Sequence, residues 1–179
     1  MYLGITFDFF YYCTQMTRHH ITFFCTFAPL KINMKTLLIA ADHAGFETKE
    51  YLKKILENQG YTVRDFGTFS NESMDYPDVV HPLADEINAG NYSIGIIICG
   101  SGNGVNMVAN KYPHVRSALC WTEEIAVLAR KHNNANIIAI PARFLDKETA
   151  LNIVNTFLNT EFEGGRHQNR IDKIIINKK

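Results

Sequence analysis

Hydrophobic and polar positions succeed one another along the chain in blocks that predict alternating strands and helices. Strands are predicted at 37–41, 61–66, 94–99, 115–120 and 137–140. Helical spacing of apolar positions predicts helices at 46–59, 77–89, 105–111, 122–132 and 146–159. Gly60 and Gly90 stand where helices would end, and Thr122 and Asp146 stand where helices would begin. We also expect the basic tail, 166–179, to form a last helix.

This alternation is typical of βαβ units, so it predicts one α/β domain in three layers, a parallel sheet with helices on both faces. We expect five strands in the order 2-1-3-4-5. Ligands of such sheets bind beyond the carboxyl ends of the strands, where the strand order reverses, here between the first and third strands. The loops that follow those strands are 42–45 and 99–104, and we expect them to lie side by side.

Residues 1–33 differ in composition from the rest of the chain. They hold 9 of the 21 aromatic residues but only 3 charged ones. No stretch reaches the roughly 18 apolar residues of a membrane-spanning helix, and neither a secretory signal nor a transit peptide fits. Three interpretations stay open: a start codon assigned too far upstream, with Met34 as the true start; a targeting leader; or an extra strand. We favour the first and expect a single domain over 34–179.

Composition and charge exclude several classes of protein. The 18 basic and 18 acidic residues give a net charge of zero, which removes the simplest electrostatic case for binding nucleic acid or an anionic membrane. Four cysteines occur without a C-x-x-C motif, so neither a zinc ribbon nor a thioredoxin motif is present. Only Cys99 and Cys120 fall in the domain, which is no disulfide framework, so we expect a reducing, cytoplasmic setting.

A glycine-rich loop follows the most apolar predicted strand. Gly100, Gly102 and Gly104 let backbone N–H groups converge, which makes a site for an anion or a developing oxyanion. Cys99 directly precedes the loop, where its thiol is either a buried structural group or a general base activated by the loop. The G-x-G-x-G spacing after the third strand does not match the dinucleotide-binding fingerprint.

Other candidate groups are an acid–imidazole pair and a set of basic residues. Asp42 and His43 end the first strand, a position more typical of a site than of a scaffold. His132 is either a cationic cap of its helix or a proton shuttle. Arg166 and Arg170 share one helix face and form either a solvated basic end or a fork for phosphate.

Taken together and in order, these motifs resemble a known family. The chain from 34 to about 174 resembles the type B ribose-5-phosphate isomerases, a family shared with allose- and galactose-6-phosphate isomerases. The motifs that carry the resemblance are DHAG at 42–45, DYPD at 75–78, CGSGNG at 99–104, ANK at 109–111, HNNAN at 132–136 and GGRHQNR at 164–170. The resemblance implies a Rossmann-like sandwich that works as a homodimer or homotetramer with sites at the interface.

The resemblance also assigns the reacting groups. Cys99 would move a proton between C1 and C2 of the open sugar, and His132 would open the furanose ring. One branch of the family uses a glutamate shortly after the glycine loop; here Val105 and Asn106 follow, so the cysteine branch fits. Backbone N–H groups would hold the enediolate oxygens with help from the hydroxyl of Ser101. These N–H groups belong to the loop residues Gly100, Ser101, Gly102, Asn103 and Gly104.

The remaining implied roles concern substrate binding. Asp42 would bind sugar hydroxyls, Asn133 would contact the sugar, and Tyr76 would line the pocket. His43 would lie at the phosphate. The arginines that would complete the phosphate contacts, some from the partner subunit, are Arg143, Arg166 and Arg170.

The expected activity is therefore the interconversion of D-ribose 5-phosphate and D-ribulose 5-phosphate through an enediolate, a step of the non-oxidative pentose phosphate pathway. It needs a base, an oxyanion site and phosphate anchors, and we expect no cofactor and no metal. A six-carbon sugar phosphate such as allose 6-phosphate is the alternative substrate. A non-enzymatic phosphosugar-binding module is the alternative from another class.

Overall fold

The structure, a computed structural model, describes residues 36–174, and the expectations for residues 1–33 lie outside this range. Its strands are β1 (Thr36–Ala41), β2 (Thr62–Asp65), β3 (Gly95–Cys99), β4 (Ser117–Leu119) and β5 (Ile137–Pro141). Its helices are α1 (Phe46–Asn58), α2 (Pro77–Asn88), α3 (Asn103–Ala109), α4 (Glu123–Asn133), α5 (Lys147–Asn159) and α6 (Arg166–Ile171). The predicted alternation of strands and helices is confirmed.

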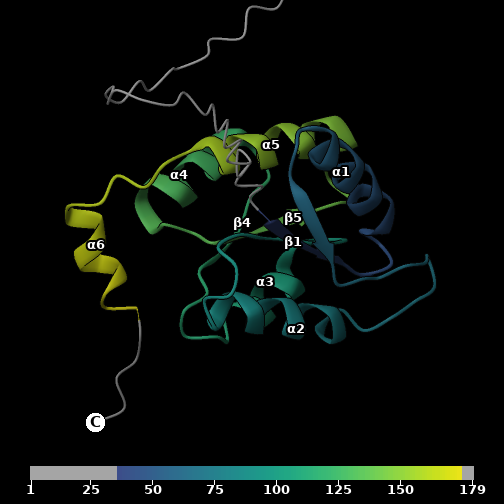
Figure 1. Ribbon diagram of the computed structural model, residues 1–179, viewed down its shortest axis with the longest axis horizontal. Coiled ribbons are helices and arrows are strands. Elements are labelled where there is room, and N and C mark those ends of the chain that lie inside the picture. The colour runs from purple at the N-terminus through teal and green to yellow at the C-terminus, as the bar shows by residue number, and fades with distance from the viewer. Residues whose placement is uncertain (1–35, 175–179) are drawn as a thin grey trace, which may run out of the picture. The chain divides into compact units, whose positions relative to one another are not determined.

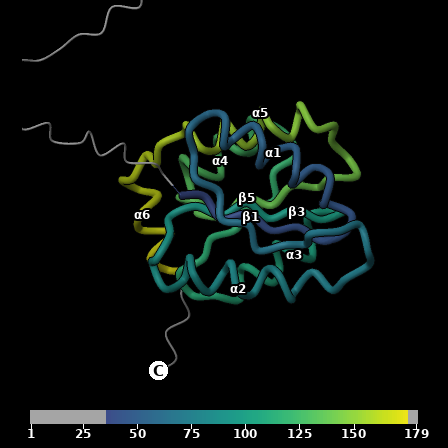
Figure 2. Tube along the Cα trace, turned by 45° about the vertical axis from the view of Figure 1, so that its right-hand side comes forward, coloured from purple at the N-terminus to yellow at the C-terminus, as the bar shows by residue number. Residues whose placement is uncertain are grey.

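The elements form three layers. Helices α1, α4 and α5 cover one face of the sheet, and α2 and α3 cover the other (Figures 1 and 2). All strand pairs are parallel. Alternate residues of the central strands enter two separate cores: Ile96 and Ile98 pack toward α1, α4 and α5, whereas Ile97 packs toward α2 and α3. Burial on both faces explains why these strands are continuous apolar runs.

The strand order is 2-1-3-5-4, so the predicted order 2-1-3-4-5 is wrong at its last two positions. β5 pairs with β3 along its whole length, from Gly95 opposite Ile137 to Cys99 opposite Pro141, and all five of its residues are buried. β4 has three residues, all half-buried, and forms the edge. The more apolar strand gains more from the central position. The switch point nevertheless stays between β1 and β3, because the exchange affects only the far side of β3.

Helix ends mostly follow the predicted capping residues. The Thr122 hydroxyl accepts a hydrogen bond from the Ile125 N–H at 3.4 Å, and the Asp146 carboxylate accepts one from the Thr149 N–H at 2.7 Å. The predicted tail helix is shorter than expected: α6 ends at Ile171, and positions 175–179 lie outside the described residues.

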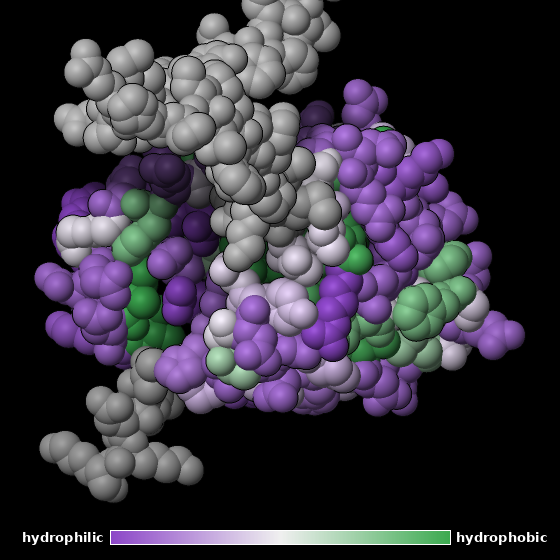
Figure 3. Space-filling view, in the orientation of Figure 1, coloured by the Kyte–Doolittle hydropathy of each residue, from purple (hydrophilic) through white to green (hydrophobic). Residues whose placement is uncertain are grey.

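Apolar side chains are concentrated in the interior. The face of the described domain seen in Figure 3 is mostly hydrophilic, with small hydrophobic patches. Between residues 36 and 174, no helix combines the length and the apolar character needed to cross a membrane.

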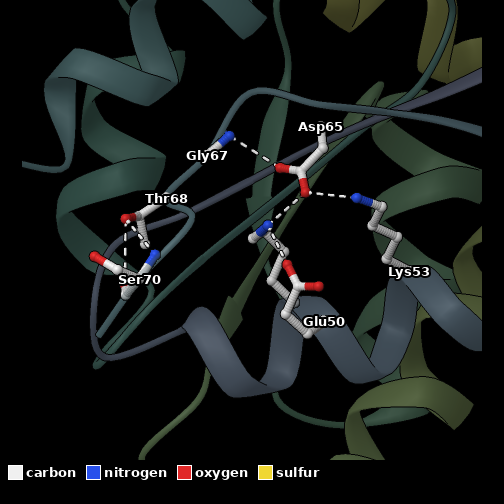
Figure 4. A network of polar contacts seen from close by, with 7 residues as sticks. Glu50, Lys53, Asp65, Gly67, Thr68 and Ser70 are labelled. Atoms are coloured by element: carbon white, nitrogen blue, oxygen red, sulfur yellow. Dashed lines mark hydrogen bonds and ion pairs between the residues drawn. The ribbon is translucent and has the colours of Figure 1, made fainter. Parts of the chain in front are cut away.

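A buried ion pair ties α1 to the end of β2. The side chain of Lys49 is fully buried, and its ammonium lies 2.5 Å from a carboxylate oxygen of Asp65 and 2.6 Å from one of Glu50. Lys53 and the Gly67 N–H also donate to Asp65, at 3.0 and 2.9 Å (Figure 4). Burial by itself would raise the pKa of Asp65, but the hydrogen bonds from Lys49, Gly67 and Lys53 hold this pKa below its usual value.

This network also positions a loop that reaches the site described below. The Asp65 carboxylate fixes the Gly67 N–H at the start of the segment that runs to Tyr76. Farther along the segment, the Thr68 hydroxyl and Ser70 exchange hydrogen bonds at 3.2 and 3.4 Å (Figure 4).

We predict that Lys49→Met lowers the free energy of unfolding by about 3 kcal/mol, because removing one partner leaves a buried carboxylate only partly compensated. Lys53→Met is the matched control: it contacts the same carboxylate from a side chain that is 28 % exposed, and we expect a loss below about 1 kcal/mol. Urea unfolding of both variants measures the difference. Equal losses would contradict a special role for Lys49.

Candidate active site

A pocket of about 320 Å³ lies at the carboxyl edge of the sheet. The loops after β1, β3 and β5 and the residue before α2 supply its walls. The residues that line it are Asp42, His43, Ala44, Tyr76, Cys99, Gly100, Ser101, Gly104, Arg143 and Phe144. The Asp42 N–H donates to the Ile98 carbonyl at 3.1 Å, so the start of the loop after β1 is bonded to the end of β3. The structure thus brings these loops side by side, as the sequence predicts.

Cys99 ends β3 at the base of this pocket. The residue is 5 % exposed, and its Sγ accepts a hydrogen bond from the Gly102 N–H at 3.0 Å. Such a donor stabilises negative charge on the sulfur. Gly102 has φ = +73°, and a Cβ there would collide with Leu119 Cδ1 and lie 3.3 Å from the Pro141 nitrogen. Only glycine can therefore present this N–H to the thiol.

Gly100 and Gly104 allow two side chains to approach the loop closely. A Cβ on Gly100 would lie 3.0 Å from Arg143 Nε, and a Cβ on Gly104 would lie 2.7 Å from Tyr76 Cζ. The Arg143 N–H also donates to the Gly100 carbonyl at 3.1 Å. A guanidinium group and a phenol ring therefore lie directly against the glycine loop, which places a positive charge beside its backbone.

Asp42 and His43 are held by backbone N–H groups. The Asp42 Oδ1 accepts from the Gly45 N–H at 3.0 Å, and the residue is 8 % exposed. The His43 Nδ1 accepts from the Met74 N–H at 3.4 Å. A ring nitrogen that accepts carries no proton, so Nε2 is the nitrogen left to donate to an anion.

The two loop residues Gly102 and Asn103 are not among the residues that line the pocket. Gly102 is buried, and the Asn103 N–H donates to the exposed Ser101 hydroxyl at 3.4 Å. Cys120, the other cysteine of the domain, is completely buried and reaches the Ala118 carbonyl at 3.6 Å. Burial raises the pKa of Cys120 to about 12, so this thiol is chemically inert.

His132, Asn133, Arg166 and Arg170 do not join Cys99 within one chain. α4 returns toward the amino edge of the sheet, and the Asn136 carbonyl accepts from the N–H of Gly95, the first residue of β3. At about 3.3 Å per residue, Gly95 and Cys99 are roughly 13 Å apart along the strand. α6 lies beside α4 at the left of Figure 1. The predicted site residues therefore form two groups at opposite edges of the domain.

His167 is a feature of the second group that the sequence pattern left unassigned. It is 4 % exposed, and its ring stacks on His132 with centroids 4.3 Å apart and planes 6° apart. Burial, followed by the charges of His132, Arg166 and Arg170, lowers the pKa of His167. Phe144, which lines the pocket, was not predicted either. It directly follows Arg143 in the loop after β5, and this position could have identified it.

A larger cavity of about 830 Å³ opens at the amino edge, between the end of α3, β4 and Asn133. It is lined by Lys111, Arg116, the hydroxyl-bearing Tyr112 and Ser117, and amide and apolar side chains, with no thiol or imidazole among its described lining residues. The chemistry therefore belongs to the smaller pocket, where Cys99 and the glycine loop meet.

Comparison with known proteins identifies the arrangement. The sequence model of the family described as Ribose/Galactose Isomerase matches residues 37–174. The chain belongs to this family. The ribose-5-phosphate isomerase B of Escherichia coli K12 is 38% identical over 141 residues, which cover 79% of this chain and 95% of that protein.

Solved structures of family members share the fold. A ribose 5-phosphate isomerase from Thermotoga maritima superposes with a TM-score of 0.77 at 47% identity, covering 79% of this chain and 97% of the other. A ribose-5-phosphate isomerase B from Mycoplasma genitalium, crystallised with bound ribulose-5-phosphate, gives 0.75 at 42% identity, covering 78% and 93%. The expected family and the Rossmann-like α/β class are confirmed.

The two thiols of this family member predict a difference in alkylation. At pH 8 iodoacetamide should modify Cys99 at least about 100-fold faster than Cys120, because a pKa of about 12 leaves almost no Cys120 thiolate. Peptide mass spectrometry at successive times measures both rates in the same sample. Similar rates at the two positions would contradict the assigned difference in environment.

Proposed function

We propose that this chain is an aldose–ketose isomerase that interconverts D-ribose 5-phosphate and D-ribulose 5-phosphate. The observation that carries the proposal is the Cys99 thiol, which accepts a hydrogen bond from the Gly102 N–H of the glycine loop and lines a pocket beside Arg143. Aldose–ketose isomerisation needs this combination: a base for a C–H proton, donors for the oxyanion, and a cation for phosphate.

In the proposed reaction the Cys99 thiolate takes the proton from C2 of the open-chain aldose. The C2–H electron pair forms the C1–C2 double bond, and the C1 carbonyl pair moves to O1, giving an enediolate. The thiol then returns its proton to C1, O2 becomes the carbonyl oxygen, and the O2 proton is transferred to O1. N–H groups of the glycine loop and the Ser101 hydroxyl hold the oxyanion, and each such donor lowers the barrier by about 3 kcal/mol.

We further propose that two copies of the chain complete each site. His132, which would open the furanose ring, and Asn133, which would contact the sugar, lie at the amino edge with Arg166 and Arg170. A homodimer that sets this edge of one copy against the pocket of the other would add these groups to Asp42 and Arg143. The 75 % exposure of Phe144, at the rim of the pocket, supports a partner on this side.

The phosphate would lie between basic groups of both copies. His43 and Arg143 are in the pocket itself, and Arg166 and Arg170 would come from the partner. The guanidinium fork suits the planar arrangement of phosphate oxygens. The free thiols of Cys99 and Cys120 support a reducing compartment, and we propose the cytoplasm.

The direct test is ribulose 5-phosphate formation by Cys99→Ala. We expect kcat to fall by about 10³-fold or more, which is within the range for loss of a general base. Cys120→Ala is the matched control and should keep kcat within a factor of about 3, since its thiol is fully buried and does not line the pocket. Undiminished turnover by Cys99→Ala would overturn the assigned base. Binding of ribose 5-phosphate without turnover by the unaltered protein would favour the non-enzymatic module.

Substrate size provides a second test. Tyr76 and Phe144 bound a small pocket, so an additional CHOH group should reduce transition-state binding by about 1–3 kcal/mol. We expect kcat/KM for ribose 5-phosphate to exceed that for allose 6-phosphate by at least about tenfold. A preference for allose 6-phosphate would establish the six-carbon alternative.

A further inference from the structure

We propose that His132, Glu163 and His167 form a binding site for a divalent transition-metal ion such as Zn²⁺, and that the bound ion inhibits the enzyme. Each residue offers one ligand atom, and these atoms all lie within 4.8 Å of one another. The binding site stands on geometry alone. Its inhibitory effect rests on the function proposed above, because His132 is the assigned ring-opening residue.

The backbone holds the three ligands together before any ion arrives. His132 lies in the last turn of α4, and the Glu163 N–H donates to the carbonyl of its neighbour Lys131 at 3.1 Å. His167 lies four positions after Glu163, in the first turn of α6, and its own N–H donates to the Gly164 carbonyl at 3.1 Å. Glu163 and His167, which follow His132 by 31 and 35 positions, are thus fixed beside it. No local metal-binding motif has this spacing, so the sequence pattern would not reveal the site.

The ligand atoms lie close enough together for side-chain rotations to bring them onto one cation. The Glu163 Oε2 and the His167 Nε2 are 3.6 Å apart, which is longer than a hydrogen bond. Ligand atoms on a tetrahedral zinc ion, each bonded at about 2.0–2.1 Å, are roughly 3.3 Å from one another. Closing the site needs a rotation of Glu163, whose side chain is 47 % exposed. It also needs the half-buried His132 ring to turn out of its stack on His167, because the lone pairs of two rings whose planes are 6° apart cannot meet at one ion.

The donor set selects the class of metal. Two imidazoles and one carboxylate suit Zn²⁺ and its transition-metal neighbours, whereas Mg²⁺ and Ca²⁺ prefer oxygen ligands throughout. Lys131 lies 3.6 Å from the second Glu163 oxygen, and Arg166 and Arg170 are on the same helix as His167. Their positive charges oppose any cation, so only an ion that bonds strongly to imidazole can remain. We therefore expect a reversible site rather than a structural one.

Occupancy would remove His132 from catalysis. A metal ion takes the ring lone pair that proton transfer to or from the sugar ring requires. The ion would also fix the His132 ring beside His167, away from a sugar in the partner's pocket. Inhibition should therefore depend on Glu163 and His167, neither of which has a proposed role in the reaction.

The binding test uses Co²⁺ as a spectroscopic substitute for Zn²⁺, with the full chain in a Cys99→Ala background that removes the pocket thiol. Titration should give visible d–d absorption and a calorimetric heat of binding. Both signals should be lost in Glu163→Gln and in His167→Gln. We expect each variant to weaken binding by at least the roughly 10- to 100-fold that a change outside the coordination shell costs. His81→Gln, which alters a surface imidazole bonded to Tyr112, is the control and should bind like its parent.

If the parent and both variants gave identical Co²⁺ titrations, these residues would not be ligands and the proposed metal site would be overturned, even if the chain bound Co²⁺ elsewhere. Circular dichroism of Glu163→Gln, an exposed substitution, verifies that the fold is retained. With the native Cys99, Zn²⁺ should inhibit ribulose 5-phosphate formation and a chelator should reverse it, whereas Glu163→Gln should resist. If Co²⁺ binds at these residues but the unaltered protein shows no isomerase turnover, the proposed function is refuted and the metal site stands. If the unaltered protein turns over but no ion binds at these residues, the metal site is refuted and the proposed function stands.

Discussion

The parallel sheet imposes the constraint on which the rest of the structure depends. All five strands run in the same direction, so every residue that follows a strand lies at one edge and every residue that ends a returning helix lies at the other. Cys99 follows β3, whereas His132 ends α4. No local rearrangement can bring the two together in one chain, because the length of the sheet separates them. A site that needs both groups must therefore draw on two copies.

Within the pocket, the glycines of the loop after β3 allow backbone and side-chain groups to approach one another closely. The left-handed conformation of Gly102 directs an N–H to the Cys99 sulfur, and the absence of side chains at Gly100 and Gly104 admits Arg143 and Tyr76. Positive charge is supplied locally, which is compatible with a chain of zero net charge. The buried Lys49–Asp65 pair contributes at a distance by fixing the start of the loop that carries Tyr76.

The sequence predicted those features that depend on neighbouring residues. The apolar run through Ile98, the caps at Thr122 and Asp146, and the proximity of the loops at Asp42 and Gly100 all follow from local patterns joined to the rules of parallel sheets. The order of β4 and β5 did not, because it depends on which strand buries more surface against β3. The stack of His132 on His167 was likewise beyond reach, since it joins two helices through a contact that no spacing encodes.

The roles of individual site residues stay predictions. The central one is that each site combines Cys99 of one copy with His132 of the other, and subunit complementation tests it most directly. Cys99→Ala and His132→Asn chains, each inactive alone, are coexpressed with different tags, and the mixed dimers are isolated through both tags. In such a dimer one of the two sites has an intact Cys99 from one chain and an intact His132 from the other. The account predicts that these dimers regain about half of the wild-type activity per dimer. Purified mixed dimers that stay inactive would contradict it.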